Sequence, residues 1–137
     1  MRKMCLDLGD VRIGVAFSDP LGIIANGFET YTRVDEEKDF DHILKLIKDW
    51  SVDTVVLGLP INMDGTEGPR VEVTRQFGDK LQAMTTAKVV YMDERLSSMS
   101  AEKLLIEADV RREKRKQVID KIAATIILQS YLDKYSK

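Results

Sequence analysis

The stretch MCLDLGDVRIGVAF, residues 4–17, decides the fold of this 137-residue chain. Apolar side chains take every second position on both sides of its Gly9-Asp10 pair, which is the period-two pattern of β-strands. Gly and Asp favour a tight turn. We therefore expect two antiparallel strands joined at this turn, followed by a third strand over residues 23–32.

Beyond these strands the spacing of apolar residues changes. They recur every three or four positions between Phe40 and Trp50, which predicts an amphipathic helix. Residues 53–60 are then almost uniformly apolar, as in a strand buried on both faces, and a helix leading into such a strand indicates a parallel crossover. The remaining expected elements are a helix over 69–84, a strand over 88–92, and helices over 97–107 and 113–135. This order is that of the RNase H-like fold, an α/β class with a mixed five-stranded sheet flanked by helices.

Size and composition favour one domain over residues 1–137. The 21 Lys and Arg against 23 Asp and Glu give a net charge of -2, so overall charge does not attract the chain to nucleic acid. No apolar run approaches the roughly 20 residues that span a bilayer, and Asp7 interrupts the place where a signal peptide is apolar. The lone Cys5 forms no internal disulfide. We expect a cytoplasmic protein outside the membrane.

Two acids occupy positions that favour apolar residues. Asp7 lies between Leu6 and Leu8 in the expected central strand, although Asp is depleted in strand interiors. The simpler interpretation is an Asx-turn into the following glycine. Asp120 lies on the apolar side of the last helix, in line with Ala124, and its simpler interpretation is a carboxylate in the first turn of a helix. The positions of both acids favour a functional role.

Asp93 and Glu94 follow the expected strand 88–92 at its carboxyl end, where sites form in α/β proteins. Alternation puts Glu94 on the side of Met92 and Asp93 on the side of Tyr91, so only one of the two faces a given site. The residues alone do not distinguish them, and an ordinary turn at the strand end is an equal alternative.

Isolated carboxylates at core positions suit Mg²⁺, which takes a few hard oxygen ligands and keeps several waters. The single His42 lies on the polar flank of its helix, so neither a zinc site nor a Ser-His-Asp triad is indicated. Two metal ions held about 3.5–4 Å apart by carboxylates can support phosphodiester hydrolysis. The sequence therefore predicts a carboxylate metal site acting on a phosphodiester.

Residues 111–116, RREKRK, are the densest charge cluster in the chain and precede Asp120 closely. Cations so placed can position the phosphates of a polyanionic substrate, and a solvated helix start is the equal alternative. The loop 62–70 lacks the Gly-Lys-Ser/Thr end of a P-loop. Its backbone amides and Arg70 suit a phosphate, although an ordinary strand-to-helix connection explains the loop more simply.

Taken together, these residues resemble the YqgF-type family, also called RuvX-like, whose members are described as Holliday junction resolvases and as pre-ribosomal RNA nucleases. The similarity runs nearly end to end. It is carried by LDLG (6–9), RIGVA (12–16), SDP (18–20), GLP (58–60), NMDG (62–65), GPR (68–70), DERLS (93–97), KRK (114–116) and IDKIAA (119–124).

The resemblance implies an RNase H-like fold, a metal-dependent nuclease site and a role in maturing the 5′ end of 16S ribosomal RNA. Carried over by position, the catalytic and metal-binding acids are Asp7, Glu94 and Asp120, with Asp93 as the alternative to Glu94. They would hold one or two Mg²⁺ or Mn²⁺ ions. Similar proteins often have Thr where this chain has Asp10, and an acid there would alter metal affinity.

One feature departs from the wider superfamily, in which many members carry a Glu at the end of the fourth strand. Residues 59–62 offer none, and Asn62 or Asp64 would substitute only in part. The resemblance implies instead that the acid of the Asp-Glu-Arg motif takes this place. The number of metal ions therefore stays open between one and two.

The expected substrate is an RNA precursor rather than a DNA junction, with the ribosome or pre-ribosomal particles as a further partner and a monomer or homodimer as the assembly. The nucleic acid is expected to contact Arg12, Arg70, Arg95, Arg111, Arg112, Lys114, Arg115 and Lys116. Three rival functions remain. A junction resolvase would need two sites in a symmetric dimer, a ribosome-assembly factor would bind without catalysis, and an actin-like ATPase would need a second domain.

Overall fold

The computed structural model of the chain describes residues 2–61, 64–93 and 112–135, and for residues 112–120 it describes the backbone alone. Within these ranges the strands are β1 (Arg2–Leu8), β2 (Arg12–Ser18), β3 (Ala25–Thr32), β4 (Val52–Leu59) and β5 (Lys88–Asp93). The helices are α1 (Glu36–Asp49), α2 (Pro69–Met84) and α4 (Arg112–Tyr135). The helix predicted over 97–107 lies outside the described residues.

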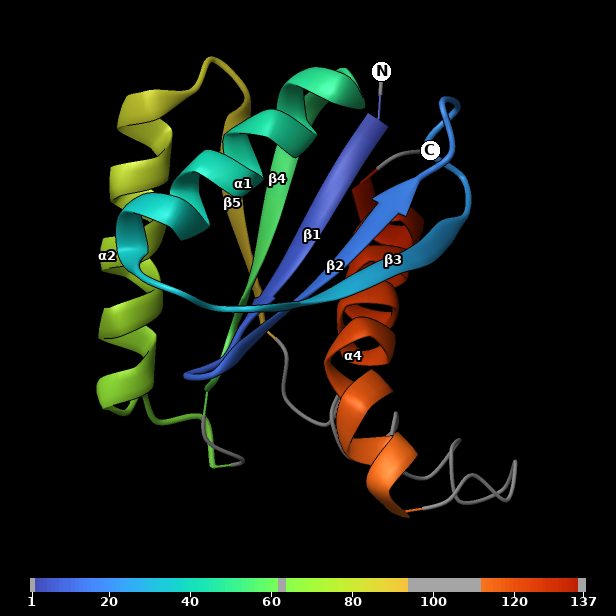
Figure 1. The fold of residues 1–137 in the computed structure, drawn as a ribbon. Coiled ribbons are helices and arrows are strands. Elements are labelled where there is room, and N and C mark those ends of the chain that lie inside the picture. Colours follow the sequence, from blue (N-terminus) through green and yellow to red (C-terminus); the bar gives the residue numbers. More distant parts are fainter. Residues whose placement is uncertain (1, 62–63, 94–111, 136–137) are drawn as a thin grey trace.

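The strands form one five-stranded sheet in the order β3-β2-β1-β4-β5 (Figure 1). β1 pairs antiparallel with β2, and β2 with β3, so the predicted meander is confirmed. β4 lies parallel to β1 on its other side, and β5 lies parallel to β4. The predicted parallel crossover is therefore confirmed, and β1 is the central strand.

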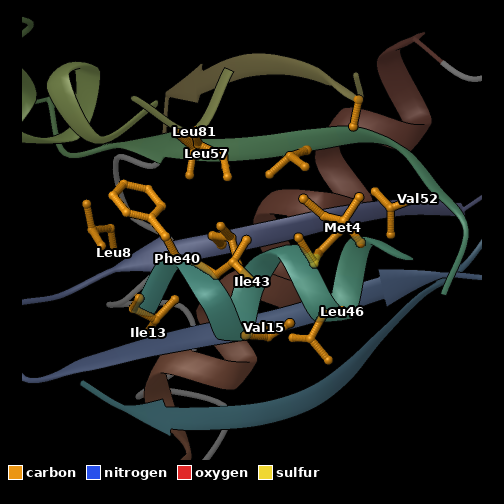
Figure 2. Close-up of a cluster of buried hydrophobic side chains, with 14 of the residues drawn as sticks. Met4, Leu8, Ile13, Val15, Phe40, Ile43, Leu46, Val52, Leu57 and Leu81 are labelled. Atoms are coloured by element: carbon orange, nitrogen blue, oxygen red, sulfur yellow. The ribbon is translucent and has the colours of Figure 1, made fainter. Parts of the chain in front are cut away.

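Helices α1 and α2 cover one face of the sheet. Figure 2 shows the cluster of apolar side chains that joins these helices to the sheet, in which Met4, Leu57 and Ile43 are fully buried. These residues alternate along the strands and recur at helical spacing in α1, which explains why sequence periodicity located them.

The opposite face is covered by α4. Cys5 and Val56 of the sheet are buried there against Ala124 and Leu128 of the helix. Cys5 and Met4 are neighbours in β1 yet pack on opposite sides, because successive side chains of a strand point to opposite faces. The molecule therefore has three layers, with the sheet in the middle (Figure 1).

Helix α1 begins one turn earlier than its apolar spacing predicts, at Glu36 rather than Phe40. The carboxylate of Asp35 accepts a hydrogen bond of 2.8 Å from the backbone N–H of Lys38, which caps the helix. Acids in the first turn add a favourable interaction with the helix dipole. The start is polar, so hydrophobic periodicity does not detect it.

Candidate active site

The candidate site is built around Asp7 near the carboxyl end of the central strand β1. Asp7 is only 9% exposed. It lies two positions after Cys5 and therefore on the same face of the strand, which is the face that α4 covers. Burying a charged group is costly unless other groups compensate, so a carboxylate at this position indicates a specific role.

Both strands beside β1 place a glycine next to Asp7. Asp7 pairs with Gly14 of β2. On the other side Leu6 pairs with Leu57 of β4, so the next position along that strand, Gly58, adjoins Asp7. Neither neighbour has a side chain, so the two adjacent strands place no side chain directly beside this carboxylate on the α4 face.

Helix α4 begins at the same edge of the sheet. Near its other end, Gln129 bridges the start of β3, accepting a 2.9 Å hydrogen bond from the N–H of Ala25 and donating one of 3.0 Å to the carbonyl of Ile23. Gln129 follows Asp120 by nine positions along the helix, a rise of about 13 Å. Met4 of β1 lies near the level of Gln129. The distance along β1 from Met4 to Asp7 is about 10 Å, which is similar to the rise along α4 from Gln129 back to Asp120.

The backbone of Asp120 precedes that of Ala124 by one helical turn and that of Ile127 by two. Both of these residues are buried against the sheet. In Figure 1 the start of α4 extends below the lower end of the sheet, the end at which β1 leads into β2. The side chain of Asp120 lies outside the described part of the structure.

Strand β5 assigns Asp93 to one face of the sheet. Val90 and Met92 pack on the α4 side of the sheet, whereas Val89 and Tyr91 pack on the side of α1 and α2. Asp93 follows the second set in alternation and is exposed. It therefore belongs to the face opposite Asp7. Glu94 lies outside the described residues.

The turn after β1, residues 9–11, is tight. The N–H of Gly9 donates a 2.9 Å hydrogen bond to the carbonyl of Arg12, and a Cβ added at Gly9 would lie 2.7 Å from that same oxygen. Only glycine fits this close approach without displacement. The Gly-Asp turn predicted from the sequence is confirmed.

Arg33 and Asp39 hold the turn from the side of β3 and α1. The guanidinium of Arg33 donates to the carbonyl of Gly9 at 2.9 Å and to the carboxylate of Asp39 at 2.9 Å. Asp39 also accepts a 3.0 Å hydrogen bond from the N–H of Val34 and is 1% exposed. Burial by itself raises the pKa of Asp39, but the hydrogen bonds from Arg33 and Val34 outweigh it and hold the pKa below its usual value.

Arg70, in the first turn of α2, reaches the same turn from the other side. One of its nitrogens donates a 3.0 Å hydrogen bond to the carbonyl of Leu8, next to Asp7, and another pairs with the carboxylate of Asp10. The sequence predicts Arg70 as a contact to nucleic acid, and the structure puts it at the edge that carries Asp7. Its pairing with Asp10, 60 residues away, is a contact that no sequence pattern indicated.

The other predicted nucleic-acid contacts are described only in part. Arg12 begins β2 at this edge and is half-buried. The backbones of Arg112, Lys114, Arg115 and Lys116 form the first turns of α4, and their side chains lie outside the described part. Arg95 and Arg111 also lie outside it.

His42 is less exposed than the sequence predicts. It is half-buried, stacks on Tyr31 with ring centroids 4.3 Å apart, and pairs with Glu29. It lies on the α1 side of the sheet, away from Asp7.

Within residues 2–61, 64–93 and 121–135, no three His, Cys, Asp or Glu side chains group as metal ligands. Over the same described part of the chain, no helix is long and apolar enough to cross a bilayer.

The strand order, with an acid on the central strand, defines a protein of the RNase H-like class. A solved structure of Fowlpox virus resolvase in complex with Holliday junction DNA superimposes with a TM-score of 0.63 and 13% identity, covering 100% of both chains. The RuvC protein of T. thermophilus, also solved with a Holliday junction, gives a TM-score of 0.60 and 11% identity over 98% of this chain and 94% of that one. At such low identity these similarities show the fold alone.

The sequence profile of the RuvX family, described as Holliday junction resolvase, matches residues 1–134, and the chain belongs to this family. Proteins named "Putative pre-16S rRNA nuclease" are similar over nearly their whole length. One from Streptococcus thermophilus is 51% identical, covering 98% of this chain and 99% of its own. One from Clostridium botulinum is 47% identical over 100% of both chains. The predicted fold class and the predicted membership in a family of nucleases are confirmed.

Proposed function

We propose that this protein is a metal-dependent nuclease that hydrolyses phosphodiester bonds in a ribosomal RNA precursor, during maturation of the 5′ end of 16S ribosomal RNA. The observation that carries the proposal is the buried Asp7 in the central strand, flanked by Gly14 and Gly58, at the edge where α4 begins. The substrate follows from the names of the relatives that are about half identical to this chain.

The residue types proposed as ligands are carboxylates, which suit magnesium or manganese. Asp7 supplies carboxylate oxygens, the ligands these ions prefer, and its neighbours in the two adjacent strands are glycines without side chains. We propose Asp7, Glu94 and Asp120 as the ligands and Glu94 rather than Asp93, because Asp93 alternates to the opposite face of the sheet. Bound there, one or two metal ions would lower the pKa of a water and neutralise charge on the leaving oxygen.

The protein's own part in the reaction is to position charges. Asp7 is held in a strand paired on both sides, which fixes its backbone relative to the sheet before substrate binds. Arg33 and Arg70 fix the turn that follows it through the carbonyls of Gly9 and Leu8. Such preorganisation matters because a misplacement of about 1 Å at a reacting group can cost about 100-fold in rate.

The basic run 111–116 and Arg70 supply the cations that bind the phosphate backbone in this proposal. Arg12 and Arg95 are proposed as further contacts. The run precedes Asp120 by one to three helical turns, so phosphates bound by it would lie close to the scissile bond. We further propose that the protein acts in the cytoplasm, as a single domain and as a monomer or homodimer.

A second candidate substrate is a four-way DNA junction, which the description of the family profile favours. Symmetric cleavage of a junction would require two copies of the site in a dimer. The test compares cleavage of a 16S ribosomal RNA precursor, a four-way DNA junction and an unrelated single strand under the same conditions. The proposal expects specific cleavage of the RNA precursor. Preferred cleavage of the junction by a dimeric protein would overturn the substrate assignment. Absence of cleavage of all three substrates would overturn the proposal that the protein is a nuclease.

A further inference from the structure

Arg70 and Asp10 form an exposed ion pair directly beside Asp7. The Asp10 side chain is 81% exposed and that of Arg70 is 39% exposed. Arg70 is anchored at the same time by its hydrogen bond to the carbonyl of Leu8, which fixes the direction of its guanidinium. Its Nη1 donates to Asp10 while its Nη2 donates to the carbonyl of Leu8.

We propose that Asp10 competes with substrate phosphate for Arg70, so that it weakens nucleic-acid binding by the free protein and is displaced when a phosphate takes its place. The inference rests on the proposed function and deepens it, because it assigns Arg70 a phosphate of the substrate and Asp10 a control of affinity. A carboxylate oxygen and a phosphate oxygen are both anionic acceptors for a guanidinium N–H, so a phosphate oxygen can replace that of Asp10 on Nη1 while Nη2 stays bonded to Leu8.

The contrast with Arg33 shows why Arg70 is the cation that can exchange its partner. Arg33 pairs with Asp39, which is 1% exposed, so loss of that partner would leave a buried charge. Asp10 is open to water, and exposed ion pairs contribute only about 0.2–1 kcal/mol. An incoming phosphate can therefore displace Asp10 at little cost, whereas Asp39 keeps its arginine.

The start of α2 strengthens the attraction for an anion at this position. Its N-cap, Gly68, has no side chain to bond the first N–H groups of the helix, and Arg70 lies in that first turn. The helix dipole adds positive potential at this end. A phosphate bound to Arg70 is thus attracted both by the full charge of the guanidinium and by the partial positive charge of the α2 N-terminus.

Removal of the Asp10 charge is expected to increase affinity by about two- to fivefold, the range that corresponds to the free energy of an exposed ion pair. The measurement is binding of a fluorescently labelled fragment of 16S ribosomal RNA precursor by anisotropy, in EDTA, so that neither cleavage nor metal affinity contributes. Asp10→Asn keeps the turn-forming shape and removes the charge.

Glu67→Gln is the matched control. Glu67 is exposed, lies three residues before Arg70, and pairs with Arg75 rather than with Arg70. The substitution Glu67→Gln removes one negative charge from the same part of the surface, as Asp10→Asn does. A second comparison repeats Asp10→Asn in an Arg70→Gln background, where the competition no longer exists.

The proposal expects tighter binding and a steeper salt dependence for Asp10→Asn, a smaller effect for Glu67→Gln, and no gain beyond that control in the Arg70→Gln background. Equal gains in the presence and absence of Arg70 would overturn it, since Asp10 would then act only through overall charge. Unchanged affinity of Asp10→Asn would overturn it too. If the wild type does not bind the RNA at all, the proposed function fails first and the inference with it.

Discussion

Asp7 of β1 lies directly opposite Gly14 of β2 in the antiparallel ladder. Side chains opposite each other in such a pair have Cβ atoms about 4.5–5.5 Å apart, so any side chain at position 14 would lie beside the Asp7 carboxylate. The position is buried on the face that α4 covers. The glycine therefore leaves no side chain on the side where the proposed site needs a metal ion and a phosphate.

The Gly14→Ala variant is expected to lose activity while it stays folded. A methyl group beside Asp7 would shift the carboxylate or the bound phosphate, and we expect kcat/KM to fall by about 10- to 100-fold. The measurement is steady-state cleavage of precursor RNA together with the unfolding midpoint. Activity equal to that of the wild type would show that the space beside Asp7 is not used.

Gly78→Ala provides the control for this experiment. A Cβ at Gly78 would collide with the hydroxyl of Tyr91 and lie 2.8 Å from Leu57, on the face of the sheet opposite Asp7. The variant is expected to be less stable by about 1–3 kcal/mol, because overpacking forces side chains from their preferred rotamers. Its kcat/KM below the unfolding range should equal that of the wild type.

The ion pair between Asp39 and Arg33 predicts an acid-sensitive contribution to stability. The folded state holds the pKa of Asp39 below its usual value of about 4, so this stabilisation is present above pH 4 and is lost as the pH falls through the folded pKa. Asp39→Asn should lower the free energy of unfolding by about 1–3 kcal/mol at pH 7. Urea denaturation of the wild type and the variant measures this difference in the free energy of unfolding.

Toward pH 3 the difference between the wild type and Asp39→Asn is expected to narrow, because Asp39 then binds a proton more readily in the unfolded state than in the folded state. Asp53→Asn is the control, since Asp53 pairs with Lys3 in a more exposed position. This substitution should lower the free energy of unfolding by less than about 1 kcal/mol. A difference between wild type and Asp39→Asn that stays constant from pH 7 to pH 3 would contradict the assigned ionisation.

The sheet could be predicted from the sequence because its residues repeat with the period of a strand. Alternation around Gly9 located β1 and β2, and the apolar run of β4 identified a buried parallel strand. Alternation also separated Asp93 from Glu94, and the packing of β5 then assigned Asp93 to the face opposite Asp7.

The contacts that hold the turn after Asp7 could not be predicted in this way. Arg70 and Asp10 are 60 positions apart, and Arg33 reaches Gly9 across 24 positions, so neither pair leaves a local pattern. The early start of α1 could not be predicted for a related reason, because a polar capping turn has no periodic pattern of apolar residues. Local regularities of the chain predict elements, whereas long-range polar contacts depend on the finished fold.

The basic run should govern the salt dependence of substrate binding. Replacing Arg111, Arg112 and Lys114 by Gln is expected to weaken RNA binding and to lower the slope of log K against log salt by up to about 2, at about 0.7 per phosphate contact on a single strand. Binding measured across a series of salt concentrations gives this slope. An unchanged slope would exclude these residues from the substrate interface.

Three exposed lysines of α1 supply the control for that experiment, since α1 covers the opposite face of the sheet from α4. Their replacement by Gln removes the same charge from the molecule, and the residues are Lys38, Lys45 and Lys48. A slope that changes as much as in the basic-run variant would mean that overall charge, rather than the run 111–116, determines binding.

The most direct test of the metal-dependent site is cleavage of a 16S ribosomal RNA precursor by the wild type and by Asp7→Asn, each with Mg²⁺, with Mn²⁺ and with EDTA. The wild type should cleave with either metal and stop in EDTA. Asp7→Asn should unfold cooperatively like the wild type and lose more than about 100-fold in activity, because loss of outer-shell partners alone costs a metal site about 10- to 100-fold. Full activity of folded Asp7→Asn, or of the wild type in EDTA, would contradict the account.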